Sequence, residues 1–208
     1  MTAESPIPTH HHEGTKVFNL RAPREPSAVD RHTEPEEREG VQNFMAQYQL
    51  PVVDRLASPL SRLKAYLGSS GSSFSISRFS DGSYPAVYMA DSDETSLAEV
   101  SFHLAERLRE TSAVKTKIHT FQLSMFILKG ETVDVRVGFP KLHRKDDWSP
   151  AQAFGAEMRT AGAKGITFKS VRNRGGVCTA VFRATLVEDG LPLPSVSLQW
   201  DGRDLVRV

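Results

Sequence analysis

The amino-acid sequence predicts an α+β domain, and three observations lead to that class. Segments with the β-branched and aromatic residues typical of strands recur along the chain, for example 86–89, 117–128 and 177–184. Apolar residues at helical spacing are confined to a few stretches, such as the one over 91–108. Turn signals rich in Gly, Asn, Asp and Ser, such as the one at 173–176, separate these segments. Many short strands with few helices are typical of α+β folds.

The composition limits the classes of protein that fit the chain. Its 208 residues, 39% of them apolar, suit one domain with its own core. The 26 basic and 25 acidic side chains leave a net charge of +1, so we expect no direct nucleic-acid binding. No apolar run approaches the roughly 20 residues that cross a bilayer, so we expect no membrane partner. The single cysteine, Cys178, excludes an internal disulfide, fits a reducing cytoplasmic compartment, and stands in an apolar stretch that favours a buried thiol.

We divide the chain at about residue 40. Residues 1–40 carry five prolines and a charged run, so we expect a loosely ordered segment with a first strand at 17–20. Residues 41–208 are the predicted domain, which starts with a helical pattern over 41–67 that breaks near Pro51. The triplet His10-His11-His12 lacks further ligands at metal-binding spacing, so we interpret it as part of a solvated tail and expect no metal.

Turn and capping signals order the remaining elements. Asp91 and Glu94 have the spacing of a capping box, so Asp91 is the predicted N-cap of the helix that follows. Gly130 is the predicted turn between two strands, and Ser149 with Pro150 predicts the start of another helix. The expected elements are a loop at 68–73, strands at 117–128 and 132–137, a helix from 149 to about 161, strands at 165–168 and 177–184, and a hairpin over 196–208.

The first candidate site segment spans residues 77–90 and contains Arg78 beside a turn at Asp81-Gly82. A guanidinium in that position suits an anionic ligand, because its planar fork can donate two parallel hydrogen bonds to phosphate oxygens. The alternative is a surface arginine next to an ordinary turn.

The second segment is the helix start over 95–103, where Glu99 lies on the face opposite the apolar stripe Leu97, Val100, Leu104 and Leu108. A carboxylate there can hold a ribose hydroxyl or stabilise positive charge that develops on a sugar ring. The alternative is a solvated helix face. His103 follows one turn later on the same face, and we leave it out of the predicted site.

The third segment spans 165–176, where Ser170 follows a strand and precedes the Gly175-Gly176 turn. A hydroxyl and free amides there can hold a carboxamide or a phosphate, and the alternative is a hairpin with two surface arginines. The sequence contains no P-loop, no Gly-x-Gly-x-x-Gly, no Gly-x-Ser-x-Gly and no Cys/His metal spacing. Glycosidase, hydrolase-triad and metalloenzyme interpretations therefore have no motif to support them.

Taken together, the three segments resemble the RES domain, a family named for its Arg, Glu and Ser positions. Residues 78–84 with 87–90 resemble the family's Arg-centred motif and the Tyr-bearing strand after it. Residues 94–100 resemble the helix that carries the family's Glu, and Glu99 follows Tyr88 by 11 residues, as that pattern requires. Residues 163–172 with Gly175-Gly176 resemble the Gly-…-Ser-Val-Arg-…-Gly-Gly block, and 199–202 resemble the closing hairpin. The resemblance covers about 74–208.

This resemblance implies an ADP-ribosyltransferase-like fold, with small mixed or antiparallel sheets around an NAD⁺ cleft and flanking helices. It implies a toxin of a bacterial toxin–antitoxin pair that cleaves NAD⁺ at the nicotinamide–ribose bond and is covered by an Xre-type antitoxin. In the family's terms Arg78 binds phosphates or ribose, Tyr88 stacks on the nicotinamide, Glu99 is catalytic and Ser170 helps to hold the nicotinamide end. A carboxylate and an aromatic face both stabilise the oxocarbenium ion that such cleavage develops.

The sequence leaves several alternatives open. The enzyme can be an ADP-ribosyltransferase that modifies a cellular protein, and the chain can instead be a non-catalytic nucleotide- or partner-binding module, or a structural interaction protein. A homodimer fits the family as well.

One position departs from the family pattern. Members commonly begin with an aromatic–Arg–Leu strand whose Arg faces the site, whereas Phe18-Asn19-Leu20 places Asn19 there. Arg21 comes two residues later and therefore on the same strand face. Arg21 either substitutes for the missing Arg or the site is weakened.

Overall fold

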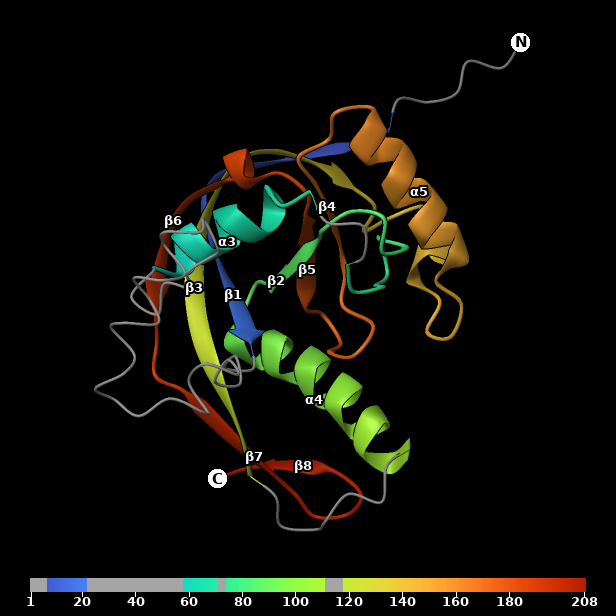
Figure 1. Ribbon diagram of the computed structural model, residues 1–208. Helices are drawn as coiled ribbons and strands as arrows, with labels where there is room; N and C mark the ends of the chain where they lie inside the picture. The colour runs from blue at the N-terminus through green and yellow to red at the C-terminus, as the bar shows by residue number, and fades with distance from the viewer. Residues whose placement is uncertain (1–6, 22–57, 71–73, 111–117) are drawn as a thin grey trace.

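The computed structural model describes residues 7–21, 58–70, 74–110 and 118–208, which form the α+β fold that the sequence predicts (Figure 1). Five strands pair in a closed ring, in which β1 pairs with β2, β2 with β5, β5 with β4, β4 with β3, and β3 again with β1. Within this ring the β3–β4 pair alone is parallel. The bounds of the ring strands are Thr9–Arg21 for β1, Val87–Ala90 for β2, Ile118–Asp134 for β3, Gly165–Lys169 for β4 and Val177–Val181 for β5.

The long strand β3 also carries the remaining strands. β6 (Val187–Pro192) pairs with its middle, and β7 (Val196–Trp200) pairs with its first residues. β8 (Leu205–Arg207) pairs with β7 and completes the predicted C-terminal hairpin. Gly202 has a φ of 102° in the connecting turn, a conformation that a glycine adopts without strain.

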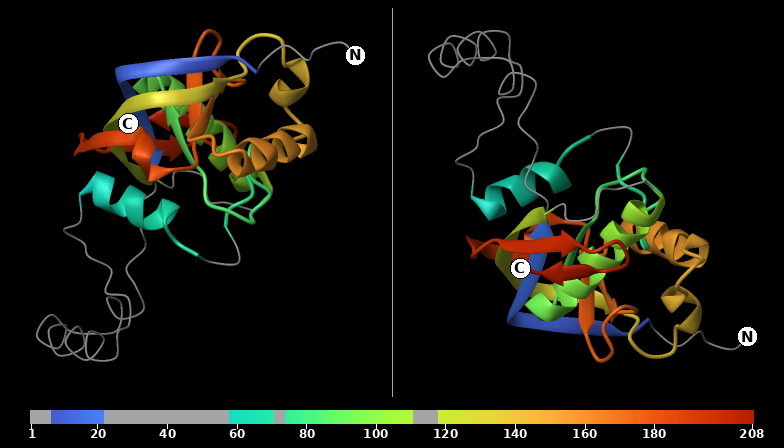
Figure 2. Two further views of the ribbon diagram at one scale, coloured as in Figure 1. Left: turned by 90° about the horizontal axis from the view of Figure 1, so that it is seen from above. Right: turned by 90° about the horizontal axis from the view of Figure 1, so that it is seen from below.

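Three helices of the described residues lie at separate positions around the strands (Figure 2). α3 (Pro59–Leu67) packs against β6, and α4 (Asp93–Glu110) packs against β1 and β2. α5 (Ser149–Thr160) packs beside the 3₁₀ helix η1 (Pro140–His143), and its bounds agree with the predicted helix. α3 confirms the last part of the helical pattern over 41–67, whereas residues 41–57 lie outside the described residues.

The histidine triplet lies within a strand, and its interpretation as a solvated tail was wrong. β1 begins at Thr9, eight residues before the predicted strand at 17–20, and the side chain of His12 is only 2% exposed. The His12 Nε2 atom lies 3.3 Å from Thr132 Oγ1 and 3.4 Å from Thr167 Oγ1, so hydroxyl groups of two neighbouring strands satisfy it. β1 has a bulge at Gly14, where φ is 76°. The bulge shifts the register between β1 and β3 directly after the histidines.

Gly130 does not separate two strands, because β3 runs through it. Its φ of 116° is accommodated inside the ladder, where it stands opposite His12 and β1 pairs with β3 on both sides of it. Two smaller predictions also need correction. Ser92, and not Asp91, accepts the backbone N–H of Thr95 at the start of α4. β5 ends at Val181 instead of residue 184, because the chain turns into the 3₁₀ helix η2 (Ala184–Leu186).

None of the helices in the described parts of the chain is long and apolar enough to cross a membrane. Among the same residues, no group of three or more His, Cys, Asp or Glu side chains is arranged to hold a metal ion.

Candidate active site

The predicted site residues come from four elements that the fold places next to one another. Tyr88 stands on β2, which pairs with β5, and β5 pairs with β4. Ser170 directly follows β4, and Glu99 lies in the second turn of α4, which follows β2 in the chain. Arg78 lies in the turn between Ser77 and Ser80, just before β2.

Glu99 and Ser170 are in direct contact, although 71 residues separate them in the chain. The hydroxyl of Ser170 donates a hydrogen bond of 2.6 Å to Glu99 Oε1. The same oxygen accepts the backbone N–H groups of Arg172 and Asn173, at 3.1 and 2.9 Å. Ser170 therefore uses its one donor on the carboxylate and its lone pairs on the loop, so that it fixes both the orientation of Glu99 and the shape of the loop.

The loop after Ser170 is anchored on the first turn of α4, and its two glycines serve different purposes. Gly175 has a φ of 89°, which side-chain-bearing residues rarely adopt. A Cβ on Gly176 would come within 2.6 Å of Thr95 Oγ1, so only glycine allows this approach between loop and helix. Asn173 Nδ2 donates a 2.9 Å hydrogen bond to the same Thr95 hydroxyl. The Gly-Gly pair therefore holds Ser170 against the helix that carries Glu99.

The start of α4 is also tied to β5. The backbone N–H of Asp91 donates to the Val177 carbonyl, and Asp91 Oδ2 accepts the Val177 N–H at 3.0 Å. Asp91 is therefore committed to the strand, which explains why Ser92 takes the capping position.

Arg78 is buried, with 7% of its surface exposed, and backbone carbonyl groups bind one of its terminal nitrogens. Its Nη1 donates to the carbonyl oxygens of Leu142 and Arg144, at 3.1 and 2.7 Å. Its guanidinium carbon lies 6.0 Å from the ring centre of Trp148. Burial lowers the pKa of Arg78, and the nearby carboxylate of Glu99 acts in the opposite direction. Arg78 thus places a fixed positive charge close to Glu99.

Tyr88 is oriented by the turn that carries Arg78. Its hydroxyl accepts the backbone N–H of Phe79 at 2.8 Å and donates to Ser77 Oγ at 3.0 Å. Burial raises the pKa of Tyr88 to about 12, so the phenol stays protonated at neutral pH. Both hydrogen-bonding functions of the Tyr88 hydroxyl are therefore used, and its ring packs edge-to-face with Phe168, with ring centres 6.2 Å apart.

Three residues that the sequence analysis did not assign to the site lie beside it, namely His103, Trp148 and Arg172. The His103 ring lies 5.9 Å from the ring of Trp148, and burial lowers the pKa of His103 while Glu99 raises it. Arg172 stacks on Phe102, with its guanidinium carbon 3.3 Å from the ring centre, and its charge also acts on Arg78. Arg172 stands in the Ser-Val-Arg block, which marks the segment as part of the motif but does not indicate what Arg172 does. No sequence pattern points to Trp148.

The departure at the N-terminal strand has a structural explanation. Asn19 Nδ2 donates a 2.7 Å hydrogen bond to the backbone carbonyl of Tyr88, so this side chain supports β2. The guanidinium of Arg21 lies 5.7 Å from the ring centre of Tyr66 on α3. The guanidinium of Arg21 is therefore directed to α3.

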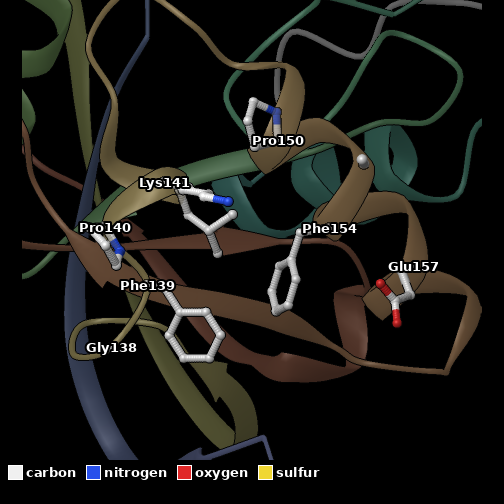
Figure 3. Close-up of a pocket in the computed structure, with 9 residues that line it drawn as sticks. Gly138, Phe139, Pro140, Lys141, Pro150, Phe154 and Glu157 are labelled. Atoms are coloured by element: carbon white, nitrogen blue, oxygen red, sulfur yellow. The ribbon is translucent and has the colours of Figure 1, made fainter.

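A separate groove lies between η1 and α5 and has a volume of about 480 Å³ (Figure 3). The rings of Phe139 and Phe154 lie side by side in it, with centres 5.8 Å apart. None of the four predicted residues lines this groove, but its wall residue Leu142 gives its carbonyl oxygen to Arg78. The groove is mostly apolar, whereas the fixed charges gather around Glu99.

Comparison with known families identifies the chain. The sequence description of the RES domain matches residues 48–201. This chain belongs to the RES domain family. The match confirms the expected family and begins well before residue 74, where the motif resemblance starts.

Comparison with the curated proteins yields no match. Among solved structures, a chain of the M. tuberculosis MbcT–MbcA toxin–antitoxin complex is similar, with 12% sequence identity and a TM-score of 0.47. The similarity covers 88% of this chain and 86% of that chain.

Proposed function

We propose that this RES domain protein is the toxin of a toxin–antitoxin pair and that it cleaves NAD⁺ at the nicotinamide–ribose bond. The observation that carries the proposal is the Glu99 carboxylate, which Ser170 Oγ holds at 2.6 Å and which lies close to the buried charge of Arg78. A carboxylate, an aromatic ring and a fixed guanidinium are the groups that a dinucleotide with a cationic leaving group requires.

The reaction breaks the bond between the ribose C1′ and the nicotinamide nitrogen, and the bonding electrons leave with the nicotinamide ring. Positive charge then develops on C1′ and the ring oxygen of the ribose. Glu99 faces this charge as a fixed anion, and a preorganised charge partner of this kind lowers the barrier because it needs no reorganisation during the step. Water attacks C1′ and loses one proton, which gives ADP-ribose and free nicotinamide.

Tyr88 and Arg78 act on binding in this scheme. Because the Tyr88 hydroxyl is committed to Phe79 and Ser77, its ring face is what remains for stacking on the nicotinamide. Arg78 has its Nη1 committed to carbonyl oxygens, so it contributes a positioned charge toward the ribose and phosphates. Ser170 orients Glu99 and supports the nicotinamide end of the site indirectly.

We extend the proposal to partners through the family resemblance. An Xre-type antitoxin that covers the site would keep such an enzyme inactive in the cytoplasm, and a homodimer is a further expected assembly. The acceptor is water in the proposed reaction, and a protein side chain is the alternative that defines an ADP-ribosyltransferase.

The test is to incubate the purified protein with NAD⁺ and to follow nicotinamide release by chromatography. Glu99→Gln should reduce release by about 10²- to 10³-fold. The matched control Glu94→Gln, an exposed carboxylate on the first turn of the same helix, should keep it. ADP-ribose formed in equal amount indicates hydrolysis. Labelled ADP-ribose that appears on proteins of an added cell extract indicates transfer. No release under either condition would overturn the enzymatic proposal and favour a binding module.

A further inference from the structure

The guanidinium of Arg172 stacks on an aromatic ring. Arg172 follows Ser170 by two residues, in the loop that packs on α4. Its guanidinium carbon lies over the Phe102 ring, 3.3 Å from the ring centre. Such a stack stabilises the charge through the ring face and fixes the orientation of the plane. It leaves the N–H groups in the plane of the guanidinium unused.

Within the described residues, the Arg172 guanidinium makes no hydrogen bond and no ion pair, and its Nε is buried without a partner. Buried donors of this kind are nearly always satisfied in folded proteins, and an unsatisfied one costs about 1–3 kcal/mol. Trp148 Nε1 is a second buried donor in the described residues without a partner, and its ring lies against His103 and near Arg78. Arg172 and Trp148 therefore each present an unused donor near Arg78 and His103, where an acceptor on a ligand can satisfy it.

The charges around Arg172 point to the chemistry of that acceptor. Its charge acts on both Arg78 and His103, so two guanidinium groups lie near each other. Glu99, the carboxylate that acts on the same two residues, already accepts the hydroxyl of Ser170. An anion that accepts hydrogen bonds from a planar fork relieves this repulsion, and phosphate oxygens match the geometry of the guanidinium.

We infer that Arg172, stacked on Phe102, binds the diphosphate of the dinucleotide substrate. This inference rests on the proposed function, since it assigns a residue to the substrate proposed above. Arg172 suits this role better than Arg78, whose Nη1 is already committed to the carbonyl oxygens of Leu142 and Arg144. Arg172 stacks on Phe102, which follows Glu99 by three residues on α4, so a diphosphate on Arg172 brings the nicotinamide ribose of the same molecule near Glu99.

The experiment measures the binding of ADP-ribose to the full chain by calorimetry, which requires no catalysis. Arg172→Gln should weaken ADP-ribose binding by about 10- to 100-fold, the loss expected for hydrogen bonds to a charged group. The matched control is Arg174→Gln, an exposed arginine in the same loop, which should bind as the wild type does. Arg172→Lys keeps the charge without the planar fork and should recover only part of the affinity.

A second readout separates phosphate binding from a structural role. Nicotinamide riboside has the same scissile bond as NAD⁺ and carries no phosphate. Arg172→Gln should raise the KM for NAD⁺ by a similar 10- to 100-fold factor and leave the turnover of nicotinamide riboside within about twofold. If Arg172→Gln does not fold, Phe102→Leu keeps the arginine without its platform and should weaken ADP-ribose binding by about 3- to 10-fold.

Three results would overturn the inference. Arg172→Gln that binds ADP-ribose as the wild type does excludes it and leaves the proposed function intact. Equal weakening by Arg172→Gln and Arg174→Gln shows a general charge effect and excludes a specific contact. A wild-type chain that neither binds ADP-ribose nor cleaves NAD⁺ contradicts the proposed function itself, and the inference with it.

Discussion

Two clusters of polar side chains lie in this fold, and they differ in burial and in charge. The neutral cluster consists of His12, Thr132, Thr167 and Thr179, whose hydroxyl groups lie 2.7 to 3.4 Å from one another or from the His12 ring. The charged cluster consists of Arg78, Glu99, Ser170 and Arg172, and it contains a buried guanidinium donor without a partner. Each cluster leaves one buried nitrogen without a partner among the described residues, His12 Nδ1 or Arg172 Nε. Fixed charge and the partial exposure of Glu99, Ser170 and Arg172 therefore distinguish the site.

This difference predicts that substitutions in the two clusters have opposite consequences. The charged cluster should contribute to activity more than to stability, because the proposed reaction uses its charges. The neutral cluster should contribute to stability alone, because its three hydroxyl groups and His12 Nε2 are directed at one another across four strands.

The largest expected effect is that of Glu99→Gln on the rate. Loss of the fixed negative charge should reduce nicotinamide release by about 10²- to 10³-fold, as for other preorganised electrostatic groups. The free energy of unfolding should change by less than about 1 kcal/mol, because the glutamine oxygen can still accept the Ser170 hydroxyl. Initial rates and urea unfolding of both proteins check this. A variant that loses stability and activity in parallel would show that Glu99 is a structural residue.

The second largest expected effect is a loss of stability at acid pH, which arises from His12 in the neutral cluster. Burial, followed by the charges of His10 and Arg136, lowers the pKa of His12 to about 4. The unfolded chain therefore binds a proton on His12 near pH 6.5, whereas the folded chain does not bind it until about pH 4. Stability falls as the pH drops through this window, at about 1.4 kcal/mol per pH unit and by about 3 kcal/mol in all.

Urea unfolding at pH 7.5 and 5.0 measures this loss. His12→Gln, which does not titrate, should flatten the dependence by about 2 kcal/mol between these two pH values. The exposed neighbour His11→Gln should keep the wild-type slope. Equal slopes for His12→Gln and the wild type would contradict the buried neutral imidazole.

His12 also shows where sequence reasoning stops. Three successive histidines in a segment rich in Pro, Thr and Glu have the composition of a tail, and their burial depends on hydroxyl groups more than 100 residues away. Gly130 is a second example. An isolated glycine predicts a turn, but β3 continues through Gly130 because β1 pairs with it on both sides. Both errors concern long-range pairing, which local patterns do not contain.

Elements whose bounds are marked by local sequence signals were predicted correctly. The helix over Ser149–Thr160 begins with Ser-Pro, and the strand Gly165–Lys169 is followed by the Gly-Gly turn that was predicted. The predicted site residues Glu99 and Ser170 are adjacent because that turn packs on Thr95. Arg172 and Trp148 have no comparable local signal, since their roles depend on which ring or charge stands beside them in space.

The third effect separates positioning from catalysis within the charged cluster. Ser170→Ala removes the donor to Glu99 and leaves two backbone N–H groups without their acceptor. We expect a loss of about 1–3 kcal/mol in the free energy of unfolding, and a reduction of kcat of about 10-fold with a smaller change in KM. Ser170→Thr should restore most of both, because it keeps the hydroxyl. A KM that rises while kcat stays constant would show that Ser170 binds the substrate directly.

The smallest expected effect tests most directly whether the neutral cluster contributes to stability alone. Thr167 is 1% exposed, and its hydroxyl lies 2.7 Å from Thr132 Oγ1 and 3.4 Å from both Thr179 Oγ1 and His12 Nε2. Thr167→Val keeps the shape and removes the hydroxyl, which should cost about 1–2 kcal/mol of unfolding free energy and leave NAD⁺ cleavage unchanged. Thr120→Val, an exposed β3 position, should change stability by less than about 0.5 kcal/mol. A tenfold loss of activity in Thr167→Val at unchanged stability would mean that the two clusters are coupled through β4, whose end carries Ser170, and that the neutral cluster has a functional role of its own.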